Sequence, residues 1–192
     1  MAPQAGLNQE IITNKALEIA DKEGMDAVTM ATLARELHVK TPSLYNHVKG
    51  LTEVKEVMAI KGFNLLFQHL KEATLDVSKG FDAIQAMGKA YIRFANQYPG
   101  MYEASLCTPD LSSKKVQVSG DAIISLMREA LSIYSLTEFE MIHTIRGIRS
   151  LLYGLVDLKR KGGFNYQVDL EDSLESIIGT FMKGLDEKMK DN

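Results

Sequence analysis

The sequence has one cysteine, Cys107, no tryptophan and only four prolines among its 192 residues. A single cysteine excludes an intrachain disulfide, so the fold does not depend on an oxidising compartment. No apolar run approaches the roughly 18 residues that a membrane-spanning helix needs. Residues 1–7 do not show a basic segment followed by an apolar stretch, so we expect no secretory signal peptide. The sequence therefore predicts a cytoplasmic protein that does not bind a membrane.

The chain also lacks an excess of positive charge, since 22 Lys and Arg are outnumbered by 25 Asp and Glu and the formal net charge is −3. Residues 1–55 carry six Lys and Arg against seven Asp and Glu, a net of −1. Within residues 35–49, however, Arg35, Lys40 and Lys49 are accompanied only by Glu36. A nucleic-acid-binding protein of this composition has to concentrate its cations on one face, because its overall charge does not attract phosphate. The segment 35–49 is the candidate for such a face.

Apolar residues make up 45% of the chain and recur mostly at helical spacing. Alternating, β-branched segments of the kind that form strands are few, so we expect an all-α fold. The expected helices cover residues 8–22, a short segment after Thr29, and residues 42–47, 51–74, 80–98, 101–106, 116–132, 137–161 and 170–190.

Capping residues mark several of these helix ends. Polar side chains that accept hydrogen bonds from N–H groups are favoured before a helix, proline in its first turn and glycine after its end. The residues that fit these roles are Gly24, Thr29, Thr41 as N-cap with Pro42 at the first helical position, Thr137 with Glu140 as a capping box, and Asp169.

The second and third helices are short and separated by a turn of three to four residues. This is the pattern of a helix-turn-helix, in which the second helix of the pair enters the DNA major groove. Leu44 and Val48 are four residues apart and are expected to face inward, against Leu33, Ala34 and Leu37. The alternative interpretation is an ordinary three-helix part of a larger bundle.

Residues in and around the predicted recognition helix suit phosphate and base contacts. Thr41 and Ser43 are short donors at a helix N-terminus, where free N–H groups already favour phosphate. Tyr45 and His47 can reach phosphate oxygens or base edges, and Lys49 follows as a phosphate contact. The predicted DNA-binding set is Thr29, Lys40, Thr41, Ser43, Tyr45, Asn46, His47 and Lys49.

Two segments resemble a known family. The run from Thr29 to Leu37, then Val39, then Ser43-Leu44-Tyr45-Asn46-His47-Val48-Lys49 resembles the DNA-binding domain of the TetR family of one-component regulators. This resemblance covers about residues 8–60. The segment from Arg146 to Leu158, with Gly162-Gly163-Phe164, Asp172-Ser173 and Gly184-Leu185, looks like the C-terminal ligand-binding domain of one TetR subgroup.

The resemblance implies a two-domain subunit, with a DNA-binding domain over residues 1–52 and a ligand-binding and dimerisation domain over residues 53–192. It implies a homodimer formed through the last two long helices, and repression relieved by a small molecule. By carry-over, Thr41, Ser43, Tyr45, His47 and Lys49 would contact double-stranded DNA. Many members have a basic segment before the first helix that contacts the DNA minor groove. Residues 1–9 here contain no Lys or Arg, so the resemblance does not extend to such a contact.

Ten methionines and seven phenylalanines are consistent with an adaptable, mainly apolar ligand pocket, because methionine is unbranched and flexible. Each such residue taken singly is better explained as core filling, and only the set suggests a pocket. The candidate ligand-binding residues are Phe63, Phe67, Met87, Tyr91, Met101, Tyr102, Met127, His143 and Tyr153.

The segment 137–161 combines a broad apolar stripe with Arg146 and Arg149. We expect both arginines to pair with Glu140 or Asp157, and binding of an acidic ligand is the alternative. Gly147, Ser150 and Gly154 lie on or near the stripe and would let a partner helix approach closely. Packing within one subunit is the other interpretation of these small residues.

Signals for other chemistry are weak. Glu140-x-x-His143 is half of a di-iron motif, but such a site needs a second copy, and none exists. We therefore expect neither a metal nor a cofactor, and interpret His143 as a core residue. The usual phosphate-loop and hydrolase motifs are missing, and Cys107 is interpreted as an inert thiol. The first hypothesis is a ligand-responsive repressor. The second is a helical ligand-binding or interaction protein with a vestigial helix-turn-helix, and an enzyme is third.

Overall fold

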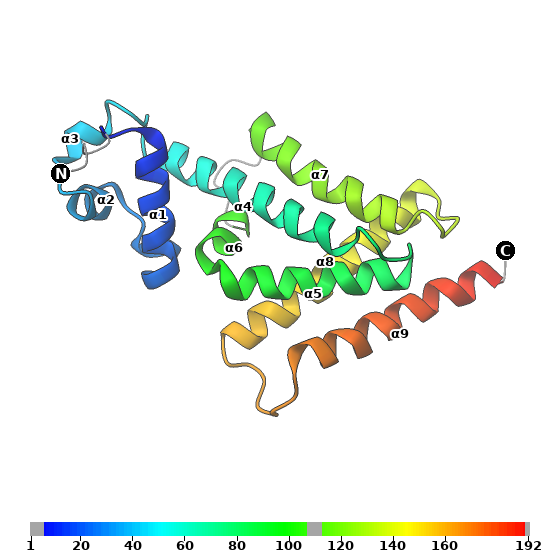
Figure 1. Cartoon of the computed structure of the whole chain (residues 1–192). Helices are drawn as coiled ribbons and strands as arrows, with labels where there is room; N and C mark the ends of the chain where they lie inside the picture. Colours follow the sequence, from blue (N-terminus) through cyan, green and yellow to red (C-terminus); the bar gives the residue numbers. More distant parts are fainter. Residues whose placement is uncertain (1–5, 107–112, 191–192) are drawn as a thin grey trace. The chain divides into compact units, whose positions relative to one another are not determined.

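The computed structural model describes residues 6–106 and 113–190, with side chains placed up to residue 187. Within these ranges the secondary structure is helical and contains no strand (Figure 1). The all-α prediction is therefore confirmed. Cys107 lies outside the described residues.

The chain forms two compact units, each of which has most of its residue contacts within itself. The first consists of Met1–Leu65 and Gln97–Gly120, and the second of Leu66–Asn96 and Asp121–Asn192. The chain passes between the units at three points, inside α4 (Leu51–Ala73), at the last residue of α5 (Phe81–Gln97) and inside α7 (Lys114–Ala130). The first unit thus takes in a segment from the middle of the sequence. The predicted boundary of functional domains after residue 52 stays a prediction.

The first unit begins with four short elements that precede α4. They are α1 (Gln9–Glu23), a 3-10 turn (Met25–Ala27), α2 (Met30–Glu36) and α3 (Thr41–Leu44). Asn8 caps α1 by accepting a hydrogen bond from the Ile11 N–H at 2.9 Å. Gly24 ends the helix with a φ of 84°, a conformation that glycine adopts without steric cost.

The core of this unit is built from the inner faces of these helices. Ile12 and Ala16 of α1, Leu33 of α2, Leu44 of α3 and Met58 of α4 are all fully buried. They belong to one apolar cluster, to which α6 (Pro99–Leu106) contributes Ala104. Burial of such side chains stabilises a small domain by about 1.5–3 kcal/mol each as an upper estimate.

The second unit packs α5 (Phe81–Gln97), α8 (Glu138–Arg160) and α9 (Leu170–Lys190) closely together. Gly88 lies at the meeting point of all three helices. A Cβ atom there would lie 2.9 Å from Leu174 Cδ2 and 3.2 Å from Leu152 Cδ2. Glycine is therefore needed at position 88 so that α8 and α9 can approach α5.

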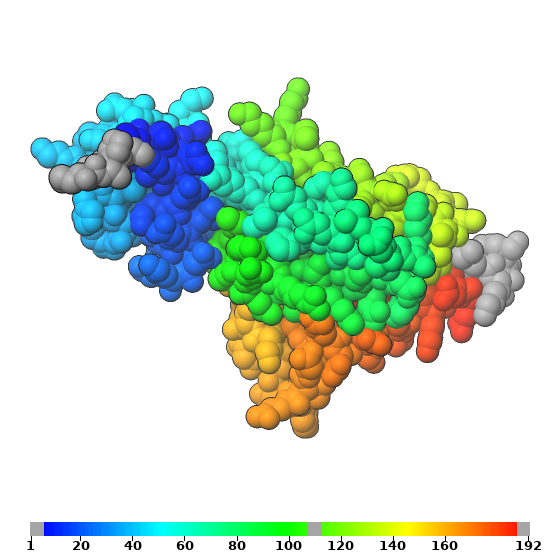
Figure 2. Space-filling view, in the orientation of Figure 1, coloured from blue at the N-terminus to red at the C-terminus, as the bar shows by residue number. Residues whose placement is uncertain are grey.

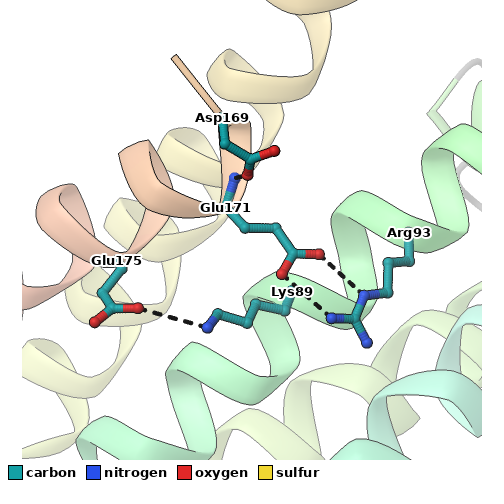
Figure 3. A network of polar contacts seen from close by, with 5 residues as sticks. All are labelled: Lys89, Arg93, Asp169, Glu171 and Glu175. Atoms are coloured by element: carbon teal, nitrogen blue, oxygen red, sulfur yellow. Dashed lines mark hydrogen bonds and ion pairs between the residues drawn. The ribbon is translucent and has the colours of Figure 1, made fainter.

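Two exposed ion pairs connect the start of α9 to α5 (Figure 3). The Arg93 guanidinium donates to both carboxylate oxygens of Glu171, at 3.0 and 3.2 Å. Lys89 Nζ lies 3.5 Å from Glu175 Oε2. Asp169 accepts from the Glu171 N–H at 2.7 Å, as predicted for a capping residue. These contacts connect the first turns of α9 to the outer face of α5.

The predicted helices agree with the structure within two residues at every end except the end of α3. The Thr29 side chain accepts from the Thr32 N–H at 3.0 Å, and Thr137 with Glu140 forms a complete capping box. Thr41 was wrongly predicted as an N-cap. It is the first residue of α3, and Lys40 takes the cap position without a side-chain bond. The helix stops at Leu44 because His47 and Val48 both donate to the Leu44 carbonyl and close a tight turn.

Candidate nucleic-acid interface

A tight turn of residues 37–40 sets α3 against α2. The Leu37 N–H donates to the Leu33 carbonyl at 2.9 Å, and the Val39 N–H donates to the Ala34 carbonyl at 3.0 Å. His38 has a φ of 55°, the one positive value on a non-glycine residue in the described chain. Histidine is among the side chains that enter this left-handed region more readily than most. The turn therefore closes without a glycine.

Two apolar residues anchor the candidate recognition segment from inside. Leu44 and Val48 are buried in the cluster that contains Leu33 and Ala34, and Leu37 packs against it. This is the arrangement that their spacing predicted. Since the inner side of the segment is fixed by apolar packing, its other side chains are held at the surface in a defined register.

Most predicted DNA-binding residues lie on that surface. Lys40, Tyr45, Asn46, His47 and Lys49 are exposed, and Tyr45 retains 54% of its accessible surface. Thr41 and Ser43 at the start of α3 are half-buried, and so is Thr29.

The surface is rich in donors and contains no carboxylate between Glu36 and Glu53. Ammonium, imidazole, phenol, amide and hydroxyl groups are those that bind phosphate oxygens and sugars in protein–DNA complexes. The Glu53 carboxylate is occupied locally, because it accepts from the Lys49 N–H at 2.5 Å at the start of α4. The segment can therefore bind a polyanion although the chain as a whole is acidic.

Support for this surface also comes from α6, which the sequence predicted as a helix over residues 101–106 but whose contacts with α1 and Met25 it did not predict. The Gly100 N–H donates to Asp21 Oδ1 at 2.6 Å, and the Met25 N–H donates to Glu103 Oε2 at 3.3 Å. A Cβ atom on Gly100 would lie 2.9 Å from the Ala20 Cβ. These partners are 79 and 78 residues apart in the sequence, so no local pattern signals the contact.

The nine candidate ligand residues differ in burial. Met87, Tyr102 and Met127 are buried, whereas His143 and Tyr153 are exposed on α8. The half-buried members are Phe63, Phe67, Tyr91 and Met101. Phe63, Met101 and Tyr102 belong to the first unit and the remaining six to the second. The pocket stays a prediction, and its best-placed members within one unit are Met87, Tyr91 and Met127.

Three predictions about α8 were wrong. His143 is not a core residue, because it lies on the surface with its ring 4.3 Å from that of Phe139 in an edge contact. Arg146 and Arg149 are exposed and form no ion pair with any described residue. The carboxylates expected to pair with them are used elsewhere: Glu140 closes the capping box, and Asp157 binds Lys161 at 3.0 Å.

The described residues contain neither a metal-binding cluster nor a membrane-spanning helix. Among residues 6–106 and 113–190, no three or more His, Cys, Asp or Glu side chains gather in a way that would hold a metal ion. In the same ranges, none of the helices combines the length and apolar character needed to cross a bilayer.

Two family models match the chain. Residues 12–49 match the model described as bacterial regulatory proteins, tetR family. Residues 84–181 match the model described as tetracyclin repressor-like, C-terminal domain. The first match contains α2, the turn and α3, and the second contains most of α5, α8 and α9.

Individual proteins show the same similarity. The uncharacterized HTH-type transcriptional regulator YobS of Bacillus subtilis is 37% identical over 187 residues, which cover 96% of either chain. A Rhodococcus protein of unknown function superposes with a TM-score of 0.77 at 18% identity, covering 96% of this chain and 98% of the other. A TetR variant of Acinetobacter baumannii in complex with minocycline gives a TM-score of 0.70 at 14% identity, covering 95% and 98%. The two solved structures show that the fold is shared.

Proposed function

The chain belongs to the TetR family of DNA-binding transcriptional regulators, and we propose that it is a repressor that binds a palindromic operator as a homodimer. We propose further that a small, mainly apolar ligand releases it from DNA. On this proposal the chain is cytoplasmic and acts by binding rather than by catalysis.

The observation that carries the proposal is the two-sided character of the segment 40–49. Leu44 and Val48 are buried, while Tyr45, His47 and Lys49 are exposed. The proposed contacts are Tyr45, Asn46 and His47 to phosphate or base edges, Lys40 and Lys49 to phosphate, and Thr29, Thr41 and Ser43 to the backbone beside the helix N-termini.

A homodimer follows from the way such a surface reads DNA. One short recognition helix covers too few base pairs for specificity, and a twofold-related pair reaches successive major grooves about 34–36 Å apart. The operator is therefore proposed to be palindromic. The dimer is proposed to form through α8 and α9, where Gly154 has no heavy atom within 4 Å of the place of a Cβ. No neighbour in its own chain thus requires a glycine at this position.

Ligand response is proposed to use the covalent connections between the units. Helix α4 runs without interruption from the first unit into the second, and α5 is joined to α6 by Tyr98 alone. Since α6 is hydrogen-bonded to α1 and to the Met25 N–H, a displacement of the end of α5 would be passed to the DNA-reading helices. A ligand bound near Met87, Tyr91 and Met127 would act through this route if it binds more tightly to one arrangement of the two DNA-binding domains in the dimer than to another.

Titration of a labelled duplex against salt tests the DNA-binding part of the proposal. We expect log Kd to rise steeply with log salt, because each phosphate contact releases bound counterions. Lys49→Ala should reduce this slope by roughly one unit and weaken binding to all sequences about equally. Footprinting should then reveal two half-sites related by a dyad. A flat salt dependence would instead support the second candidate, an interaction protein with a vestigial helix-turn-helix, which the net charge of −1 over residues 1–55 favours.

A further inference from the structure

Nine consecutive residues that follow α8 are exposed, from Lys161 to Asp169. Gly162, with a φ of 70°, turns the chain out of the helix, and the Gly163 N–H donates to the Leu158 carbonyl at 2.7 Å. Residues 163–168, here called the arm, then run without regular structure to α9. In Figures 1 and 2 the connection between α8 and α9 projects from the edge of the second unit, beyond α5.

The arm carries apolar side chains at every second position. Phe164, Tyr166 and Val168 retain 41%, 86% and 57% of their accessible surface, and Asn165 and Gln167 alternate with them. A solvated connection is normally polar, and neighbouring exposed apolar side chains indicate a contact surface. None of these three side chains is buried by the described chain.

The charges of α8 bear on which partner covers the arm. The first turn of this helix carries Glu138, which also binds Arg128 of α7, and Glu140, which closes the capping box, and its last turn is basic, with Lys159 and Arg160. Two copies of α8 placed antiparallel across a twofold axis therefore bring ends of opposite charge together, and the helix dipoles favour the same arrangement. A parallel pair would bring like charges together. The helix is thus self-complementary in one direction only.

The outward face of α8 fits such a crossing near its middle. Ser150 is exposed, and Gly154 has no neighbour in its own chain to exclude a larger side chain. Glycine is unfavourable in a helix interior, so a close approach from outside the chain accounts for it. If the α8 helices of two subunits cross near Ser150, the last turn of one α8 lies beside the first turn of the other. There Phe139 is 72% exposed.

We propose that the arm of each subunit packs over the Phe139 end of α8 in a second copy of this chain, so that Phe164, Tyr166 and Val168 are buried in the dimer. The inference rests on the homodimer of the proposed function and names the partner and the contact residues. The two arms would contact the antiparallel α8 pair at both of its ends. Arg146 and Arg149, which form no ion pair with any described residue, would lie between these two contacts.

Disulfide trapping tests the contact directly. In a Cys107→Ser background, one chain carries Phe139→Cys and a second carries Tyr166→Cys. After mixing, subunit exchange and mild oxidation, we expect a covalent dimer that neither variant forms alone. Within one chain, Phe139 lies at the start of α8 and Tyr166 lies beyond its end, and the helix between them has 23 residues and is about 34 Å long at 1.5 Å per residue. A mixture of Leu75→Cys with Tyr166→Cys is the matched control, since Leu75 is equally open to solvent, and it should give no product.

Sedimentation equilibrium supplies the second readout. Phe164→Ser, Tyr166→Ser and Val168→Ser together should raise the dimer Kd at least tenfold. Leu75→Ser with Val118→Ser, two other exposed apolar positions, should change it less than twofold. The arm contact would be overturned if the unsubstituted chain is a dimer but the mixed Phe139→Cys and Tyr166→Cys variants give no covalent product. It would also be overturned if the serine substitutions in the arm leave the dimer Kd unchanged. Either result would leave the proposed homodimer intact. An unmodified chain that stays monomeric at micromolar concentration would overturn both.

Discussion

The helix-turn-helix and the second unit contrast in how far their contacts reach along the chain. In the reading segment, Thr29 caps its own helix, Leu44 packs on Leu33, and the turn at His38 is closed by bonds to residues three to five positions away. In the second unit, α5 is joined to α9 by pairs that are 78 and 86 residues apart. The first region is therefore specified by nearby residues, and the second by the meeting of distant ones.

The same contrast appears in the sites that the two regions carry. A DNA-reading surface needs only exposed donors on a firmly anchored short helix, and one stretch of ten residues supplies both. A ligand pocket needs side chains from several helices to converge, and the spacing of each helix says nothing about which faces meet. The spacing thus predicts the inner and outer faces of the first kind of site, while its DNA contacts and the pocket residues stay predictions.

The largest expected effect concerns the anchor of the reading segment. Leu44→Ala removes a fully buried side chain and leaves a cavity, so it should lower the free energy of unfolding by roughly 2–5 kcal/mol. Chemical denaturation followed by circular dichroism measures the change. Tyr45→Ala, at the neighbouring exposed position, is the control and should leave stability nearly unchanged. Equal effects of the two substitutions would show that the inward and outward faces have been assigned wrongly.

A pair of glycines tests the contribution of long-range contacts. Gly100→Ala would place a Cβ 2.7 Å from Asp21 Oδ1 and 2.9 Å from the Ala20 Cβ, and it should destabilise the first unit by about 1–3 kcal/mol through overpacking. Gly154→Ala has open space around it and should leave the fold of the subunit as stable as before or slightly more stable. Thermal unfolding monitored at low protein concentration compares the two. A Gly100→Ala variant of unchanged stability would contradict the close packing of α6 on α1.

The sequence predicted the all-α fold, the helices and the inner face of the recognition segment, because each depends on spacing and caps within about 20 residues. It missed the role of α6, whose partners Asp21 and Met25 lie almost 80 residues away. It also placed His143 in the core, although the apolar stripe of α8 is broad enough to leave that position outside. A helical period says which residues share a face, and only the tertiary fold says whether that face is covered.

The next effect in size is the hydroxyl of Tyr45. Tyr45→Phe keeps the ring and removes one hydrogen bond to DNA, so operator affinity should fall by about fivefold, or on the order of 1 kcal/mol. Tyr45→Ala should lose more affinity, because the ring contact is removed as well. Fluorescence anisotropy at fixed salt gives both values, and circular dichroism verifies that the fold is kept. Affinity unchanged in both variants would remove Tyr45 from the interface.

The smallest expected effect on stability comes from the ion pairs between α5 and α9. These pairs join residues far apart in the sequence but contribute little free energy. Arg93 binds Glu171 through two hydrogen bonds, and this bond and the adjacent negative charge raise the pKa of the Arg93 guanidinium. Exposed pairs of this kind contribute only about 0.2–1 kcal/mol, because solvent screens them and two long side chains lose freedom. The apolar packing of α9 includes the fully buried Leu174, which lies against Gly88 of α5. A double-mutant cycle of Arg93→Ala and Glu171→Ala should therefore give a coupling free energy below about 1 kcal/mol that shrinks further in 1 M salt.

The control is Lys183→Ala, because Lys183 is an exposed cation on α9 without an ion pair to any described residue. A coupling well above this range would mean that charge, and not apolar packing, holds α9 on α5, and the contrast between the two regions would then have to be restated in electrostatic terms.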